Sequence, residues 1–103
     1  MWTEIAEADL LEIIEYIAQD SKSKAIKILG KIKNKTSRLN TSPERGRIAP
    51  ELQKFNLNLI HEIIESPWRI LYKYEEDVVY ILGVIDSRRN VEDILLNRFL
   101  RKE

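Results

Sequence analysis

The chain has 103 residues, a size that suits one domain spanning 1–103, and its 17 basic and 17 acidic side chains leave no net charge. The absence of cysteine excludes disulfides and thiolate metal sites. There is no run of about 18 apolar residues, so we expect no membrane span. The acidic N-terminus lacks the basic and then apolar pattern of a signal peptide, so we expect a cytoplasmic protein, and we expect neither a cofactor nor a bound metal.

Two amphipathic helices are predicted in the first forty residues. Thr3 has the residue type of an N-cap, and acidic residues follow it, as suits a helix start. Apolar residues then recur at helical spacing up to a polar turn near Asp20, namely Ala6, Leu10, Ile13, Ile14 and Ile17. Ser21 or Ser23 caps a second helix, whose stripe is Ala25, Ile28, Leu29, Ile32, Thr36 and Leu39. Because the turn is so short, residues 4–40 should form an antiparallel helical hairpin.

Charge is unevenly distributed along this hairpin. Residues 1–20 carry six acids and no Lys or Arg, whereas residues 21–50 carry nine bases and one acid. The second helix alone holds Lys22, Lys24, Lys27, Lys31, Lys33 and Lys35. Two interpretations stay open: solvated helix faces of opposite sign, or a docking surface for an acidic partner.

The second half of the chain predicts an antiparallel sheet. A loop, SPERGRIAPEL at residues 42–52, separates it from the hairpin. Extended segments follow at about 56–65, 68–75 and 78–86, joined by short turns, and a short helix follows Arg89. The predicted fold class is therefore α+β: an N-terminal antiparallel helical hairpin packed on an antiparallel sheet of three strands, or four, with a short C-terminal helix.

The pairing of the last two strands decides which side chains share a face. If Glu75 pairs with Val78, strict alternation places Arg69, Asp86 and Arg88 together, on the side away from the helices. The other side would receive the helices through apolar and aromatic residues, namely Ile70, Tyr72, Tyr74, Val79, Ile81 and Ile85. A shift of one residue would move the side chains of one strand to the opposite face.

These segments resemble the RelE/ParE superfamily, the toxins of type II toxin–antitoxin pairs. WTEIAEADLLEIIEYIA (2–18) resembles the first helix of the family, LNTSPERGRIAPEL (39–52) its loop, and IHEIIESPWRILYKYEEDVVYILGVIDSRR (60–89) its sheet. NVEDIL (90–95) resembles the tail of the ParE-like branch. The resemblance implies a cognate antitoxin, growth inhibition by the free toxin and a role in plasmid stabilisation. RelE-like members cut messenger RNA in the ribosome, whereas ParE-like members inhibit DNA gyrase.

The resemblance also implies a set of binding residues. Arg69 matches the family's strand arginine, and Arg88 or Arg89 matches the basic cluster that ends the last strand. Arg45 and Arg47 lie in the matching loop and could contact a phosphate or a protein surface. The structural alternative for Arg69 is an ion pair with a carboxylate, either Asp86 or Glu62.

The same resemblance leaves open whether the chain is an enzyme. In a ribonuclease, Arg69 and Arg88 would clamp phosphate and Glu51 would be the base that takes a 2′-hydroxyl proton. Asp86, however, stands where many relatives carry a histidine, and no His or Tyr follows position 80. The only histidine, His61, is predicted to face Tyr72 in a structural role.

We therefore favour a ParE-like toxin that binds its target. The alternatives are a RelE-like messenger RNA endoribonuclease acting on the ribosome, and an inactive relative that serves as a binding module. Relatives usually carry a short strand before the Trp-Thr motif. If the sheet lacks this strand, its exposed edge would invite strand addition by the antitoxin or by a second copy in a homodimer.

Overall fold

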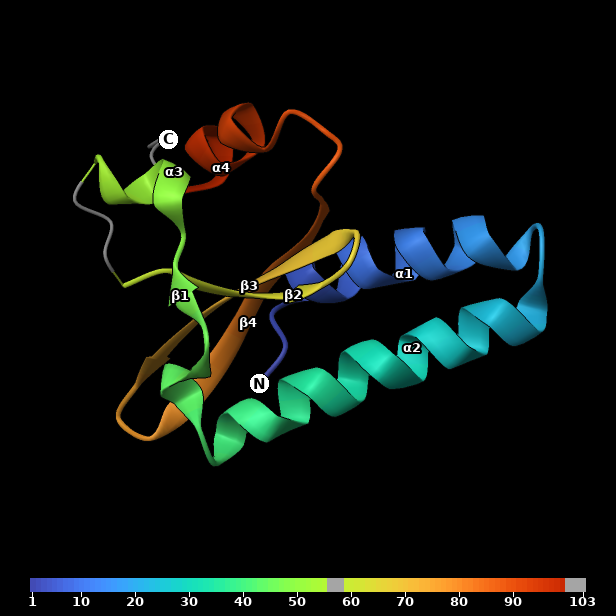
Figure 1. Cartoon of the computed structure of the whole chain (residues 1–103), viewed down its shortest axis with the longest axis horizontal. Helices are drawn as coiled ribbons and strands as arrows, with labels where there is room; N and C mark the ends of the chain where they lie inside the picture. The colour runs from blue at the N-terminus through green and yellow to red at the C-terminus, as the bar shows by residue number, and fades with distance from the viewer. Residues whose placement is uncertain (56–58, 100–103) are drawn as a thin grey trace.

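The computed structural model describes residues 1–55 and 59–99. In chain order these residues form α1 (Glu4–Ala18), α2 (Lys22–Ser37), η1 (Arg38–Asn40), η2 (Pro43–Arg45), β1 (Arg47–Ile48), α3 (Pro50–Gln53), β2 (His61–Glu65), β3 (Trp68–Glu75), β4 (Val78–Asp86) and α4 (Val91–Phe99). The predicted α+β fold is confirmed, with its helical hairpin, antiparallel sheet and C-terminal helix (Figure 1). In the part of the chain that the structure describes, no helix is both long and apolar enough to span a bilayer.

The helical hairpin begins at the caps that the sequence indicated. The Thr3 hydroxyl accepts a hydrogen bond from the Ala6 amide at 3.2 Å, and the Ser21 hydroxyl accepts one from the Lys24 amide at 3.2 Å. Each contact satisfies an amide of the first turn that has no partner inside its helix. Helix α1 ends at Ala18, slightly before the expected position, because the next residues form the turn.

The sheet has four antiparallel strands in the order β1-β2-β3-β4. Strand β1 lies inside the predicted loop and pairs Arg47 with Glu62 and Ile48 with His61. The loop expectation is wrong for this stretch, which also contains η2 and α3. The expected first extended segment, 56–65, is a strand only from His61 onward, and its residues 56–58 lie outside the described residues.

The outer edge of β4 is covered by the beginning of the chain. Trp2 forms a single parallel bridge with Ile81. The Ile81 amide donates to the Met1 carbonyl at 2.8 Å, and the Thr3 amide donates to the Ile81 carbonyl at 3.1 Å. The residues before α1 thus form a bridge in place of a strand. The edge that the missing strand would leave exposed is thus occupied at Val79 and Ile81, whose backbone groups bond to Met1 and Thr3.

A β-bulge in β4 changes the expected faces of the sheet. Glu75 pairs with Val78 as predicted, but the register shifts at Leu71, which pairs with Gly83 and leaves one extra residue in β4. Beyond the bulge, each β4 side chain lies on the face opposite to the one expected from strict alternation. Asp86 is therefore on the side of α1 and α2.

Two apolar cores lie on the two faces of the sheet and confirm this register. Val84 packs in the core under α1 and α2, with Ala6, Leu10, Ile32, Leu39, Ile70, Tyr72, Val79 and Ile81. Ile85 packs in the core under α3 and α4, with Ala49, Leu52, Ile60, Leu71, Val91 and Leu95. Arg69 pairs with Ile85 and shares its face. The prediction that Arg69, Asp86 and Arg88 lie together on one face is therefore wrong.

Candidate functional site

Arg69 on β3 lies at the centre of an ion network on the α3 and α4 side of the sheet. Its Nη1 and Nη2 donate to the two carboxylate oxygens of Glu51, each at 2.7 Å. Its Nε donates to Glu62 Oε1 at 2.7 Å, and its Nη2 also contacts that oxygen. The Arg47 Nε donates to the other Glu62 oxygen at 2.7 Å. Only 8% of Arg69 and 1% of Glu62 is exposed, so the centre of this network is largely removed from water.

The strand registers explain why these residues meet. Glu62 lies opposite Leu71 on β3 and opposite Arg47 on β1. Arg69 is two residues from Leu71 and therefore lies on the same face as Glu62. Helix α3 begins with a proline, a favoured first helical residue, and this places Glu51 in its first turn. The predicted structural pair between Arg69 and Glu62 is confirmed, whereas the alternative pair with an aspartate at the end of β4 is wrong.

The ion pair between Glu51 and Arg69 favours the charged form of both side chains. The hydrogen bond from Arg69 lowers the pKa of Glu51, although burial acts in the opposite direction. The hydrogen bond with Glu51 in turn raises the pKa of Arg69, again against the effect of burial. A lowered pKa makes Glu51 a weaker base, and all three guanidinium nitrogens of Arg69 already donate to carboxylates. The arrangement is thus well suited to holding β1, β2, β3 and α3 together.

The basic cluster after β4 lies on the other side of the sheet. The Asp86 carboxylate accepts hydrogen bonds from Arg88 Nε at 2.9 Å, from Arg88 Nη2 at 2.6 Å and from the Arg88 backbone amide at 2.9 Å. These contacts lower the pKa of Asp86 to about 2. Asp86 therefore stays ionised and orients Arg88, whose side chain is 73% exposed. Arg89 is exposed as well.

A cavity of about 580 Å³ opens beside this cluster, bordered by residues of α1, α2 and the ends of β3 and β4. Apolar, aromatic and charged side chains of both signs line it, among them Ile13, Tyr16, Ile17, Lys24, Ile28, Trp68, Arg88 and Arg89 and the acidic residues Asp9, Glu12 and Asp86. Tyr16 is 76% exposed. Tyr, Trp and Arg around an apolar hollow are the side chains enriched where proteins bind one another. This cavity can therefore receive the surface of a partner protein.

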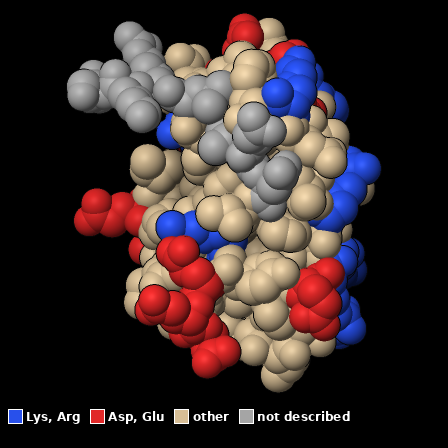
Figure 2. Space-filling model, turned by 90° about the vertical axis from the view of Figure 1, so that its left-hand side faces the viewer, with Lys and Arg blue, Asp and Glu red and all other residues tan. Residues whose placement is uncertain are grey.

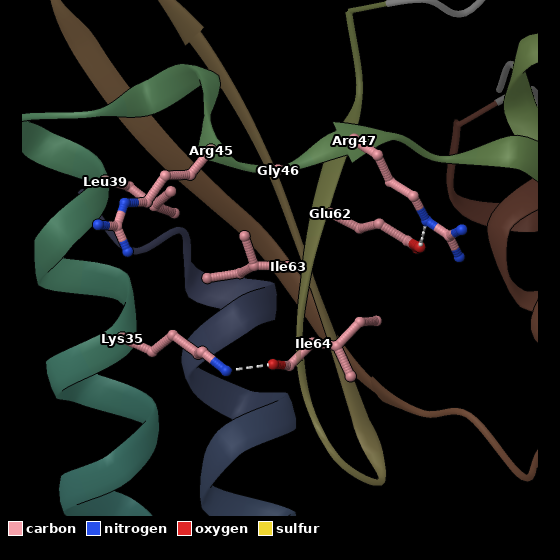
Figure 3. Close-up of a pocket in the computed structure, with 8 residues that line it drawn as sticks. All are labelled: Lys35, Leu39, Arg45, Gly46, Arg47, Glu62, Ile63 and Ile64. Atoms are coloured by element: carbon pink, nitrogen blue, oxygen red, sulfur yellow. Dashed lines mark hydrogen bonds and ion pairs between the residues drawn. The ribbon is translucent and has the colours of Figure 1, made fainter.

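Arg45 and Arg47 flank Gly46 but point to different sides of the sheet edge (Figure 3). Both arginines line a hollow of about 390 Å³ beside β2, and Arg47 also donates to the Glu62 carboxylate. A Cβ at Gly46 would lie 2.4 Å from the Glu62 carbonyl oxygen and 2.5 Å from the Tyr72 hydroxyl. The glycine of the Arg-Gly-Arg sequence is thus required by close packing of the backbone.

The predicted site residues are consequently distributed over three places. The ion network contains Arg47, Glu51 and Arg69, and the cavity beside β4 contains Arg88 and Arg89. The hollow along α2 contains Arg45 and borders the ion network, because Arg47 lines it as well. The bulge in β4 is the physical reason that the first two groups are on opposite faces.

An ion pair that sequence reasoning missed joins α1 to α4. Arg98 Nη1 and Nη2 donate to the Asp9 carboxylate at 2.7 and 2.8 Å, and Asp9 also accepts the Val84 amide at 3.0 Å. The hydrogen bond with Asp9 raises the pKa of Arg98. A Cβ at Gly83 would lie 2.8 Å from the Arg98 guanidinium. A glycine inside an apolar strand signals such a close approach or a bulge, and here it marks both.

His61 packs among aromatic side chains. It pairs with Tyr72 across the strands, and its ring centroid lies 5.6 Å from that of Tyr72 and 5.2 Å from that of Tyr74. Its Nδ1 is 3.3 Å from the Leu59 carbonyl oxygen. The predicted position facing Tyr72 is confirmed, and these contacts fit a structural role.

Comparison with protein families matches residues 1–91 to the family described as the ParE toxin of type II toxin–antitoxin system, parDE. The match includes the helical hairpin, the whole sheet and the first residue of α4. No curated protein matches the chain.

Proposed function

The chain belongs to the ParE toxin family of type II toxin–antitoxin systems, and from this premise we propose that it inhibits growth by binding DNA gyrase. Membership of the family implies an antitoxin as a partner. We propose that the chain acts in the cytoplasm, that residues 1–103 form one toxin domain, and that the cognate antitoxin neutralises it by binding.

The ion network around Arg69 is the observation that supports binding in preference to catalysis. Cleavage of RNA needs a cation that is free to hold the phosphate and a base that is free to take a proton. The guanidinium of Arg69 is occupied by two carboxylates, and Glu51 is one of them. Releasing Arg69 to a phosphate would leave the buried Glu62 side chain with one partner fewer, which is costly.

The cavity beside Arg88 and Arg89 is the surface that we assign to the gyrase contact. It offers exposed guanidinium groups, the exposed ring of Tyr16 and an apolar interior. These features fit a partner surface that presents an acidic side chain next to an apolar one.

The alternative is a RelE-like endoribonuclease that cuts messenger RNA on the ribosome. The exposed Arg88 and Arg89 favour it, because guanidinium groups bind phosphate oxygens in pairs. In that function Arg69 and Arg88 would clamp the phosphate and Glu51 would act as the base. The separation of Arg69 and Arg88 onto opposite faces of the sheet counts against it.

Two assays on the purified protein separate these functions. We expect the toxin to block supercoiling by DNA gyrase and to leave messenger RNA intact on translating ribosomes. We also expect growth arrest when the chain is expressed without its antitoxin. Cleaved messenger RNA with normal supercoiling would establish the ribonuclease instead, and unaffected growth would indicate an inactive relative.

A further inference from the structure

The outer face of the helical hairpin carries exposed apolar side chains. Helices α1 and α2 lie side by side and cover one face of the sheet, while α3 and α4 lie on its other face (Figure 1). Leu11 of α1 is 58% exposed and Ile26 of α2 is 70% exposed, so the fold leaves both side chains in contact with water. Large apolar side chains that stay exposed side by side are typical of surfaces that bind another protein.

On α1, acidic side chains stand on either side of Leu11. Glu4 is seven residues before Leu11 and Glu15 is four residues after it, and residues at these intervals lie on one face of a helix. Both acids are exposed. The outer face of α1 therefore presents an acid, an apolar side chain and a second acid along its length.

On α2, basic side chains stand on either side of Ile26 at the same intervals in the reverse order. Lys22 is four residues before Ile26 and Lys33 is seven residues after it, and both lysines are exposed. The Lys33 ammonium lies 4.2 Å from the centroid of the Trp2 ring, a contact that leaves its positive charge without a counter-ion. The outer face of α2 thus presents a base, an apolar side chain and a second base.

The acids of α1 and the lysines of α2 do not neutralise one another within the chain. Among the residues that the structure describes, no ion pair joins α1 to α2, and none involves Glu4, Glu15, Lys22 or Lys33. Charge is segregated on the face shown in Figure 2 as well, where Lys and Arg lie along one margin and Asp and Glu form separate groups. Segregated charges of this kind attract a partner surface of opposite sign.

We propose that this outer face binds a second copy of the same chain, with α1 of each copy lying antiparallel on α2 of the other. In that arrangement the seven-residue and four-residue intervals of α1 coincide with those of α2, about 10.5 and 6 Å along either helix. Each contact joins one copy to the other: Glu4 meets Lys33, Leu11 meets Ile26 and Glu15 meets Lys22. A two-fold axis applies every contact twice, so the assembly closes as a dimer with four packed helices.

Charge selects this arrangement and this partner. Packing α1 on α1 would bring acids against acids, and packing α2 on α2 would bring lysines against lysines, so only the α1–α2 contact is attractive. A nucleic acid would be attracted by the lysines but repelled by Glu4 and Glu15 on the same face. A self-complementary contact needs both signs of charge and an apolar centre on one surface, and the outer face of the hairpin carries all of them.

The size of the face sets the strength that we expect of the dimer. Helices α1 and α2 have 15 and 16 residues. They are therefore about 22–24 Å long, and two adjacent helices are about 20 Å wide. A contact of this size is at the low end of specific protein interfaces, so we expect dimer and monomer to exchange at micromolar concentrations. This inference goes beyond gyrase inhibition and does not depend on it.

Sedimentation equilibrium of the full chain, from about 1 µM to about 1 mM, tests this proposal. Two charge-reversed variants are compared with wild type. Glu4→Lys with Glu15→Lys makes the outer face basic on both helices, and Lys22→Glu with Lys33→Glu makes it acidic on both. All four side chains are exposed, so both proteins should fold, and circular dichroism checks this.

Lys24→Glu with Lys31→Glu is the matched control. It makes the same change of charge on the same helix, but these two lysines line a hollow beside the β2–β3 turn and so lie on another side of α2. Both are exposed, like the lysines of the outer face. A loss of association caused by net charge alone would therefore appear in the control as well.

We expect each charge-reversed variant alone to dimerise at least about tenfold more weakly than wild type, and the control within about twofold. An equimolar mixture of the two charge-reversed variants should dimerise again, because every α1 then meets an α2 of opposite charge. Mixing would not rescue variants that had merely lost their fold. A wild-type protein that stays monomeric, a charge-reversed variant that dimerises like wild type, or a mixture that stays monomeric would each overturn the proposal.

Discussion

Arg69→Ala should lower the stability of this protein strongly, because it leaves a buried carboxylate with too few partners. The Glu62 side chain has 0% exposure, and after the substitution only Arg47, itself 68% exposed, still pairs with it. Removing one partner of a buried ion pair costs about 3–5 kcal/mol. Glu51 adds less to this cost, because its side chain is 26% exposed and water can reach it. Native domains are stable by about 5–15 kcal/mol, so the loss is a large part of the total.

Urea and thermal unfolding, followed by circular dichroism, measure this loss. For a domain of about 100 residues, 1 kcal/mol corresponds to about 4–8 °C in Tm, so the Tm of Arg69→Ala should fall by more than about 10 °C. Arg88→Ala is the matched control: its guanidinium also pairs with a carboxylate, but in solvent, where such a pair is worth about 1 kcal/mol or less, so its Tm should fall much less than that of Arg69→Ala. Replacing both Arg69 and Glu62 with leucine also removes the buried carboxylate that Arg69→Leu alone would leave without this partner. This double variant should be more stable than Arg69→Leu alone.

A stable Arg69→Ala protein would refute the structural role of the ion network. If that stable protein were also harmless to cells, Arg69 would have to act on the target, and the ribonuclease would become the better explanation. An unstable Arg69→Ala protein together with a toxic Arg69→Leu/Glu62→Leu variant would instead separate toxicity from the guanidinium. The double variant therefore keeps the test informative when the single variant fails to fold.

Three further predictions follow from the packing and the charges. Gly46→Ala should destabilise the protein by about 1–3 kcal/mol in urea unfolding, because the added Cβ would lie 2.4 Å from a carbonyl oxygen. Gly30→Ala, on a helix with nothing within 4 Å of the added Cβ, should stabilise it by about 0.5–1 kcal/mol, and a similar loss at both positions would contradict this packing. The pKa of Asp86 is lowered from 3.8 to about 2, so its ion pair stabilises the fold above about pH 4 and this stabilisation is lost as the pH falls toward 2. Asp86→Asn should flatten the dependence of Tm on pH between about pH 4 and 2. An unchanged slope would show that the Asp86 ion pair does not contribute to stability. Arg88→Glu with Arg89→Glu should raise the toxin concentration needed for gyrase inhibition by at least about tenfold. The Tm should fall only slightly, because the ion pair with Asp86 that is lost is exposed to solvent. Undiminished inhibition would move the gyrase contact to another surface.

The helical hairpin could be predicted because the capping residues and the spacing of the apolar residues indicate the same two helices. Thr3 and Ser21 have the residue type of an N-cap, and each is followed by an apolar stripe at helical spacing. Strand β1 could not be predicted in the same way. Two residues between Gly46 and Ala49 show no alternation, and they form a strand only because β2 lies beside them.

The bulge in β4 could not be predicted from the sequence, for a different reason. A bulge reverses the faces of the residues beyond it, and in a strand with one polar face this reversal would bury charged side chains. The segment Val78–Ile85 is apolar at almost every position, so either register buries apolar residues and the pattern does not distinguish them. The sequence prediction therefore placed Asp86, the first charged residue after the bulge, on the wrong face of the sheet.

The charge pairs in the fold indicate which cations remain for partners. Arg47, Arg69 and Arg98 are neutralised by carboxylates of other elements, and so they hold the molecule together. Arg88 pairs with Asp86, two residues before it in the chain, and its side chain remains 73% exposed. Arg88 and Arg89 both line the cavity beside β4. Because their guanidinium groups are exposed to solvent and do not join distant elements of the fold, they can contact a partner without breaking a buried ion pair.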